Sequence, residues 1–249
     1  MSTMFSFAFV LSSLAGLSTL LGCIFIFFPI KNKENMIVFA LSFASGVMLT
    51  VSIIDLIPSS IHSIQSTFYL IPSILIGCIS IVTGILLSIF IDEKLPKHQD
   101  SLKRVGLFSM VAIILHNIPE GIATYLTTNH NTHLGITLAI AIALHNIPEG
   151  ITISIPIYFS TKSRFKAFFY TLLSGLSEPL GALLAGLFLQ NIMTDTIMGI
   201  LYGIIAGIMI HISIYELLPN AYHHHKPRRL FTAFLLGASI MLFSHGIIE

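Results

Sequence analysis

Apolar residues gather in eight long runs along this 249-residue chain, and short polar segments separate the runs. Each run reaches the ~20 residues that a helix needs to cross the hydrocarbon core of a bilayer. Backbone groups inside lipid must be satisfied within their own segment, so we expect helices. The expected spans are 5–30, 36–57, 68–91, 105–126, 134–159, 165–190, 196–218 and 230–248. No connection is long enough for a soluble domain, which predicts one transmembrane domain over residues 1–249.

Composition agrees with this pattern. The chain is 55% hydrophobic and 9% charged, whereas about a quarter of the residues of a soluble domain are charged. These values predict an all-α integral membrane protein with the lipid bilayer as its surroundings and no nucleic-acid partner. The two cysteines, Cys23 and Cys78, both lie inside apolar runs and offer no disulfide framework.

The positive charges follow a strict alternation along the chain. All twelve Lys and Arg residues fall in or beside odd-numbered connections between spans, and none falls in an even-numbered connection or at a terminus. They are Lys31 and Lys33, then Lys94, Lys97, Lys103 and Arg104, then Lys162, Arg164 and Lys166, and finally Lys226, Arg228 and Arg229. The positive-inside rule therefore predicts odd connections in the cytoplasm and both termini on the extracytoplasmic side.

One polar motif occurs twice inside apolar runs. The sequence Leu-His-Asn-Ile-Pro-Glu-Gly-Ile stands at 115–122 and again at 144–151. An ionised acid in hydrocarbon costs about 2.5–3.5 kcal/mol even on lenient insertion scales, so the repetition indicates function. On a helix, residues at i and i+4 share one face, which pairs His116 with Glu120 and His145 with Glu149.

Two asparagines and a third acid complete the expected cluster. Asn117 and Asn146 stand beside the motif histidines, and the sixth run carries Glu178 at a similar depth. Both motifs begin about 16 Å into their spans, roughly half of a ~30 Å hydrocarbon core. Imidazole, carboxylate and amide donors without thiolate suit zinc, iron(II) or manganese. The pattern predicts a divalent-metal site at the membrane midplane. Gly121 and Gly150 follow the motif acids, where we expect a neighbouring backbone to come close.

A second repeat is less obvious. Residues 46–58 resemble residues 207–219 at a constant offset of 161, and Asp55 then matches Glu216, with Thr50 matching His211. The second and seventh spans run in opposite directions, so the match indicates an inverted-topology repeat such as secondary transporters use. Chance similarity between apolar helices is the alternative. We expect Asp55 near the extracytoplasmic face, Glu216 near the cytoplasmic face, and both on the ion path together with His211.

The doubled His-Asn-Ile-Pro-Glu-Gly motif, the Ser-Glu-Pro at 177–179 and the acids and prolines of spans two and seven resemble the ZIP family of metal-uptake transporters, in particular its short bacterial zinc-uptake branch. The resemblance implies eight helices in a 3+2+3 arrangement, with spans one to three and six to eight as the inverted repeat. It also implies a secondary transporter of the bacterial inner membrane.

The same resemblance implies the substrate and its ligands. Zinc, and also iron(II) or manganese, would be carried into the cytoplasm as substrate rather than held as cofactor, and no enzyme activity is expected. One ion would take His116, Glu120, His145 and Glu149; the second would take Asn117, Glu120, Asn146, Glu149 and Glu178. A homodimer is one candidate assembly.

Two other classes of function remain as alternatives. An intramembrane zinc-dependent hydrolase would also place histidines and acids around zinc, but the chain lacks a His-Glu-x-x-His pair and would leave no free general base. A metal-gated channel would share the site without transport turnover. The triplet His223, His224 and His225 is either a receiving site for the released ion or an ordinary polar loop.

Overall fold

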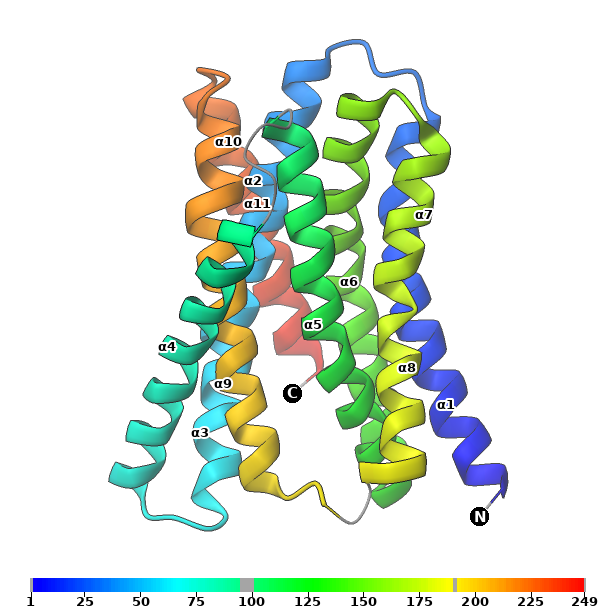
Figure 1. Ribbon diagram of the computed structural model, residues 1–249, viewed down its shortest axis with the longest axis vertical. Coiled ribbons are helices and arrows are strands. Elements are labelled where there is room, and N and C mark those ends of the chain that lie inside the picture. The colour runs from blue at the N-terminus through cyan, green and yellow to red at the C-terminus, as the bar shows by residue number, and fades with distance from the viewer. Residues whose placement is uncertain (1, 95–100, 190–191, 249) are drawn as a thin grey trace.

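The computed structural model describes residues 2–94, 101–189 and 192–248, and every regular element in these ranges is helical (Figure 1). Eight helices there are long and apolar enough to cross a membrane, which confirms the predicted fold class. The elements are α1 (Ser2–Leu17), η1 (Ser18–Phe27), α2 (Lys33–Val51), η2 (Ser52–Leu56), α3 (Ile57–Gln65), α4 (Leu70–Lys94), α5 (Ser101–His130), α6 (Thr132–Thr161), α7 (Arg164–Gly175), α8 (Ser177–Leu184), η3 (Ala185–Leu189), α9 (Asp195–His211), η4 (Ile212–Leu217), α10 (Leu218–Tyr222) and α11 (Pro227–Ile248). Lys97 and Gln190 lie outside the described residues.

Span two is longer than its apolar run. The run was expected to end at residue 57, but α2, η2 and α3 together form one helical span, Lys33–Gln65. Pro58 stands in the first turn of α3 directly after the π-helical η2, where the regular α-helical hydrogen-bond pattern is already interrupted. Beyond it the helix is amphipathic, with Ile64 buried and His62 exposed. Hydropathy falls at this point while helical structure continues.

Two π-helical segments interrupt the long spans at matching places. In span two η2 contains Asp55, and in span seven η4 contains Glu216, the residue matched to Asp55 at the offset of 161. Each segment is followed by a proline, Pro58 or Pro219, at the start of the next α-helix. Such wide turns are frequent at functional sites. Their matching positions support the inverted repeat.

The contacts between helices divide the eight spans into two groups of four. In one group, here called the α9 group, α2 packs against α11 and α4 packs against α9. In the other, the α5 group, α5 packs against α6 and α8, and α6 packs against η1. The α9 group comprises Lys33–Gln65, Leu70–Lys94, Asp195–Tyr222 and Pro227–Gly246; the α5 group comprises Phe7–Phe27, Ser101–His130, Thr132–Thr161 and Arg164–Leu189.

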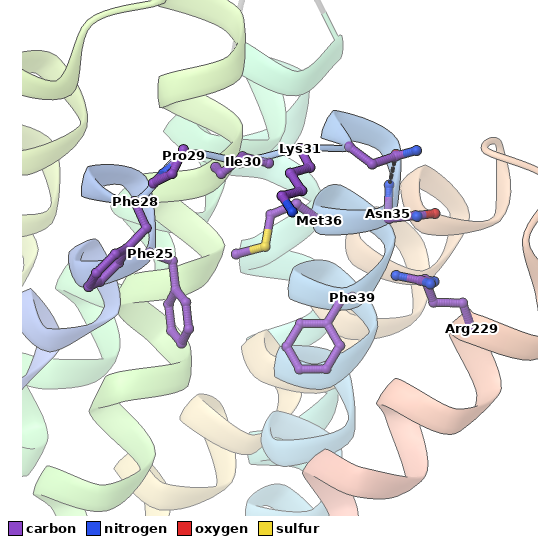
Figure 2. A pocket seen from close by; sticks show the side chains of 10 residues that line it. Phe25, Phe28, Pro29, Ile30, Lys31, Asn35, Met36, Phe39 and Arg229 are labelled. Carbon is purple, nitrogen blue, oxygen red and sulfur yellow. Dashed lines mark hydrogen bonds between the residues drawn. The ribbon is translucent and has the colours of Figure 1, made fainter.

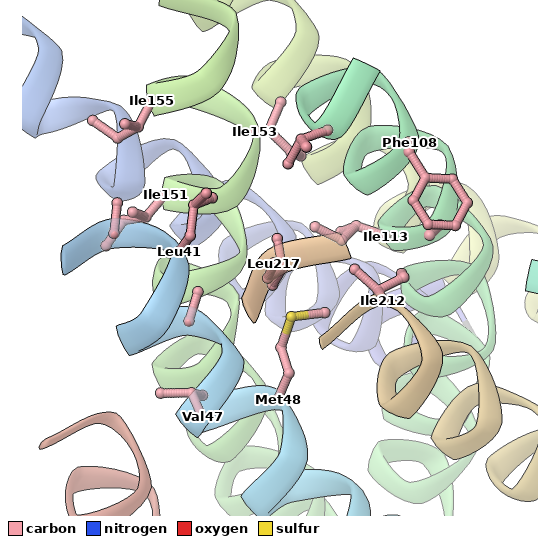
Figure 3. Packing of buried hydrophobic residues seen from close by; sticks show 14 of the residues in the cluster. Leu41, Val47, Met48, Phe108, Ile113, Ile151, Ile153, Ile155, Ile212 and Leu217 are labelled. Atoms are coloured by element: carbon pink, nitrogen blue, oxygen red, sulfur yellow. The ribbon is translucent and has the colours of Figure 1, made fainter. Parts of the chain in front are cut away.

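A buried hydrophobic cluster joins the two groups (Figure 3). Leu41 and Met48 of α2 and Leu217 of η4 contribute from the α9 group, and Phe108 and Ile151 contribute from the α5 group. Burying such side chains stabilises a contact by about 1.5–3 kcal/mol each in water. Within a bilayer, close fit and dispersion carry more of this stabilisation than water release does. The cluster therefore stabilises the contact between the α5 and α9 groups through close side-chain packing.

Glycines bring helices into backbone contact within each group. A Cβ on Gly121 would overlap the carbonyl oxygen of Glu178, and one on Gly150 would overlap that of Thr19. The prediction that a neighbouring backbone approaches these two glycines is thus confirmed. Small residues at helix interfaces allow this approach in membranes. The contacts fix the motif helices α5 and α6 against spans six and one, respectively.

The α9 group repeats one such contact with its partners exchanged. A Cβ on Gly46 would overlap the carbonyl oxygen of Phe234 in span eight, and one on Gly207 would overlap that of Ile81 in span three. Gly46 matches Gly207 in the sequence repeat, so span two meets span eight as span seven meets span three. We call spans two and eight the span-two arm of the α9 group, and spans seven and three its span-seven arm. The two arms have the same kind of glycine-to-backbone contact.

The described one–two, five–six and seven–eight connections lie at one end of the bundle, the upper end in Figure 1, here called the basic end because these connections carry Lys and Arg residues. Lys226 Nζ lies 2.8 Å from Glu34 Oε2 and ties the seven–eight connection to the start of α2. Lys33 and Lys162 both place their ammonium groups over the Phe159 ring, at 5.5 and 5.7 Å from its centroid. The odd connections therefore share one side of the molecule.

Candidate metal centre

The two motif histidines face each other across α5 and α6. Both helices run for 30 residues, and each carries its His and Glu one turn apart on the face turned toward the other helix. The ring centroids of His116 and His145 are 6.1 Å apart. All four motif side chains are buried, with His116 and Glu149 at 1% exposure. The predicted pairing of the two motifs is therefore present in the fold.

The histidines and acids contact each other across the two helices. His145 Nε2 lies 2.9 Å from Glu120 Oε1, and His116 Nε2 lies 3.1 Å from Glu149 Oε1. Within α5, His116 Nε2 is also 3.3 Å from Glu120 Oε1. One ligand atom each from His116, Glu120 and His145 falls within 4.8 Å of the others. This is the spacing of donors that converge on one ion.

The two motif asparagines hold their amide groups by backbone contacts. Asn146 Nδ2 donates to the carbonyl oxygen of Ala15 at 3.0 Å and to Glu178 Oε2 at 2.9 Å. Asn117 Nδ2 lies 3.5 Å from the carbonyl oxygen of Ser174, a longer contact of the same kind. With the nitrogen engaged, each amide turns its oxygen away from these partners. Glu178 joins the cluster through Asn146.

The cluster contains an unusual concentration of buried polar atoms that form no hydrogen bond, although His116 Nε2 and Glu149 Oε1 lie 3.1 Å from each other. Seven side chains of the cluster each have at least one buried oxygen or nitrogen that forms no hydrogen bond among the described residues. They are His116, Asn117, Glu120, His145, Asn146, Glu149 and Glu178. The oxygens are Oδ1 of both asparagines, Glu120 Oε2, both carboxylate oxygens of Glu149 and Glu178 Oε1. Leaving one buried polar group unpaired costs about 1–3 kcal/mol. Buried polar groups in native proteins are nearly always paired, so a concentration of this kind is what a cation-binding site would present.

A cavity of about 80 Å³ lies between the two groups and reaches the cluster. Its walls include Glu120 and His145 from the α5 group and Asp55 and Tyr202 from the α9 group. Asp55 accepts a hydrogen bond from Ser59 Oγ at 3.1 Å. The expectation that Asp55 stands near the extracytoplasmic face is wrong, because the helix continues to residue 65. Asp55 instead lies deep in the span, beside the cluster.

A larger cavity of about 320 Å³ opens toward the end opposite the basic end. Tyr202 and Ala123 line both cavities, so the two are neighbours. The larger one is also lined by His130, at the end of α5, and by Asp195, at the start of α9. Polar groups therefore lead from this end of the bundle toward His145.

His211 and Glu216 lie on the other side of the cluster, toward the basic end. His211 Nδ1 is 2.9 Å from Ser88 Oγ, and its ring stacks on Tyr215 with centroids 5.0 Å apart. Glu216 is buried at 8% exposure, with Asp92 and Arg104 as its charged neighbours. The structure brings these two residues together with Asp92 but not with the histidines of the central cluster.

Comparison with known proteins decides the family. The sequence profile described as ZIP Zinc transporter matches residues 92–245. The zinc transporter ZupT of Stenotrophomonas maltophilia is 36% identical over 245 residues, which cover 92% of this chain and 91% of the relative. ZupT of Oceanobacillus iheyensis is 36% identical over 257 residues, covering 95% and 96%, and that of Chlorobaculum parvum is 40% identical over 240 residues, covering 89% and 90%. The chain belongs to the ZIP family.

The family settles several expectations. ZIP proteins are transporters and not enzymes, and zinc is their substrate rather than a cofactor. The intramembrane-hydrolase alternative is therefore excluded. Eight spans and the bacterial relatives make this ZIP protein a multi-pass protein of the inner membrane.

Sequence reasoning missed three participants in this ZIP structure. Tyr202 lines both cavities, the Ser174 carbonyl lies at Asn117, and Arg104 binds Asp92 at 2.6 and 2.7 Å. In the sequence, Arg104 served only as one of the basic residues that orient the spans in the membrane. Tyr202 stands five residues before Gly207 in an otherwise apolar stretch, and that isolated phenol was the available signal. Backbone carbonyls leave no signal in sequence.

Proposed function

We propose that this ZIP protein carries zinc and related divalent ions, iron(II) and manganese among them, into the cytoplasm through a binuclear site formed by α5, α6 and α8. The single observation that carries the proposal is the set of seven buried His, Asn and Glu side chains with unpartnered atoms at one place between these helices. A pair of divalent cations would supply the missing partners. It would also offset the repulsion among Glu120, Glu149 and Glu178.

The first ion takes His116, Glu120, His145 and Glu149. Two ligands that are each about 2.05 Å from a tetrahedral zinc lie roughly 3.3 Å from one another. The observed separations of 2.9, 3.1 and 3.3 Å are close to this edge length. Small side-chain rotations would therefore bring these atoms around one ion.

The second ion takes oxygen donors alone. Asn117 and Asn146 have their amide nitrogens directed to backbone carbonyls, which leaves Oδ1 of each for a cation. Glu178 supplies a third oxygen, and Glu120 and Glu149 bridge the two ions. Oxygen donors bind zinc more weakly than a closed cysteine site does, as a transported ion requires.

Direction follows from charge and from the cavities. The basic end faces the cytoplasm by the positive-inside rule, so the cavity that contains His130 and Asp195 faces outward. An ion enters there, passes Tyr202 and Asp55 and reaches His145. The glycine contacts hold each group together internally, so a shift between the α5 and α9 groups exposes the centre to His211 and Glu216. One chain holds the complete ligand set, and a second copy is not required.

The test is zinc uptake by purified protein in sealed vesicles. Glu149→Ala removes a bridging ligand and should lower the initial uptake rate at least a hundredfold, because both ions lose a donor. Removing a charge from the bilayer interior should leave insertion intact. Glu93→Ala is the matched control, since Glu93 is exposed at the end of α4.

The same uptake measurement also distinguishes the proposed carrier from a metal-gated channel. Near-normal uptake by folded Glu149→Ala protein would refute the binuclear site. Uptake that never saturates with zinc concentration would favour a metal-gated channel over a carrier.

A further inference from the structure

A cavity of about 390 Å³ lies at the basic end, away from the metal centre (Figure 2). It is formed where η1 ends, α2 begins and the first turn of α11 passes. Phe25 and Phe28 line it from span one and Phe39 from span two. Lys31 and Arg229 supply its basic side chains. One cavity thus combines an aromatic wall with two cations.

Neither cation has an ion-pair partner among the described residues. The nearby carboxylate of Glu34 is already bound to Lys226 at 2.8 Å, and Lys226 also reaches Asn35 Oδ1 at 2.9 Å. That contact leaves the amide N–H groups of Asn35 free to donate. No carboxylate lines the cavity. Its polar side therefore offers only positive charge and neutral amides to a ligand.

The apolar side is exposed where span one leaves the membrane. Phe28 is 64% exposed and Phe25 is 39% exposed. Phenylalanine rings at a span end are apolar and lie where the hydrocarbon layer of the bilayer begins. A soluble anion would gain nothing from these rings, whereas acyl chains would cover them. Cations placed only to set topology would need no cavity between three helices.

We propose that this cavity binds an anionic phospholipid, with the phosphodiester headgroup between Lys31 and Arg229 and the acyl chains along Phe25 and Phe28. Basic pockets between transmembrane helices are suited to anionic headgroups. The bound lipid would connect span one of the α5 group to spans two and eight of the α9 group.

The experiment measures lipid binding to the purified full chain by native mass spectrometry, with phosphatidylglycerol and the zwitterionic phosphatidylcholine as probes. The variant Lys31→Gln/Arg229→Gln removes both cations. Each basic residue near an anionic surface is worth about fivefold in affinity, so binding of phosphatidylglycerol should weaken roughly thirtyfold. Lys166→Gln/Arg228→Gln is the matched control, because it removes one exposed Lys and one exposed Arg that do not line the cavity.

Three results would overturn the proposal. These are equal binding of both lipids by the native protein, equal loss in variant and control, or displacement of the lipid by inorganic phosphate, which would indicate a soluble-anion site. If the Gln variant does not fold, a photoactivatable phosphatidylglycerol gives the answer on the native chain. It should label residues within 25–39 or the first turn of α11, and labelling confined to other segments would refute the site.

Discussion

The acids of spans two and seven occupy equivalent positions, yet they meet different surroundings. Asp55 is partly buried, accepts a hydrogen bond from Ser59, and lines a cavity with Glu120 and His145. Glu216 is buried beside Asp92, whose carboxylate is bound by Arg104. The backbones match, down to the π-helical segments and the following prolines.

The difference teaches that backbone symmetry and side-chain access are separate properties of this fold. Two arms with equivalent backbones can take turns as the open side of the ion path only if, in any one structure, their acids have different surroundings. Here Asp55 of span two borders a cavity next to the candidate metal centre, whereas Glu216 of span seven is packed against the Asp92–Arg104 pair. With the orientation and direction proposed above, the structure corresponds to the outward-facing member of a pair of states, and this interpretation can be tested from each arm.

The largest expected effect is the sidedness of labelling. In a background of Cys23→Ala and Cys78→Ala, which removes both native thiols, Asp55→Cys should react with an impermeant thiol reagent added outside. Glu216→Cys should react only from inside. Each preference should exceed a hundredfold in rate, because the membrane blocks the other route. Mass spectrometry of intact protein after timed labelling measures it.

The cysteine-free background is the control for labelling at other groups. If both positions react from the same side, the inverted repeat fails and the comparison of arms loses its basis.

The next largest effect is a loss of stability when the glycine contact that both arms share is disturbed. Gly46→Ala and Gly207→Ala each place a methyl group against a backbone carbonyl, of Phe234 and Ile81 respectively. Overpacking of this kind costs about 1–3 kcal/mol. We expect both variants to lower the melting temperature in detergent by similar amounts, since the contacts are equivalent.

Gly246→Ala is the matched control, because an added Cβ there meets no atom within 4 Å. A large loss at one glycine and none at the other would contradict equivalent packing of the two arms.

The centre of the molecule could be predicted from sequence, and the surroundings of the two acids could not. His116 and His145 share a face and a depth on neighbouring helices, so their meeting follows from periodicity and membrane thickness. Gly121 and Gly150 follow from the same repeat. By contrast, hydropathy measures the cost of lipid exposure, so it missed the helix beyond Pro58 and placed Asp55 too near the surface.

Contacts between side chains of different helices do not follow from the periodicity of the sequence either. The Arg104–Asp92 pair joins α5 to the end of α4 across a connection without any pattern, and Tyr202 faces two cavities only because α9 lies beside α3 and α5.

A smaller effect separates the arms kinetically. Asp55→Asn removes a negative charge beside the approach to His145, and such charges raise local cation concentration. The half-saturating zinc concentration for uptake should rise about threefold to tenfold. Glu216→Gln should instead lower the maximal rate by a similar factor with little change in half-saturation, because it acts after the ion leaves the centre. Initial rates over a range of zinc concentrations measure both. Identical kinetic changes in the two variants would contradict distinct roles for the arms.

The smallest effect is expected at the charged pair beside Glu216. The side chains of Arg104 and Asp92 are 26% and 22% exposed, and exposed ion pairs contribute about 0.2–1 kcal/mol. If the pair helps to close the inner side, Arg104→Gln shifts the balance of states by no more than this. A free-energy change of that size corresponds to at most about fivefold in an equilibrium. The rate of inside labelling at Glu216→Cys should therefore rise about twofold to fivefold. Lys103→Gln removes the neighbouring cation and serves as the control. An unchanged rate in Arg104→Gln, or an equal rise in Lys103→Gln, would show that the pair stabilises the end of α4 without closing the path.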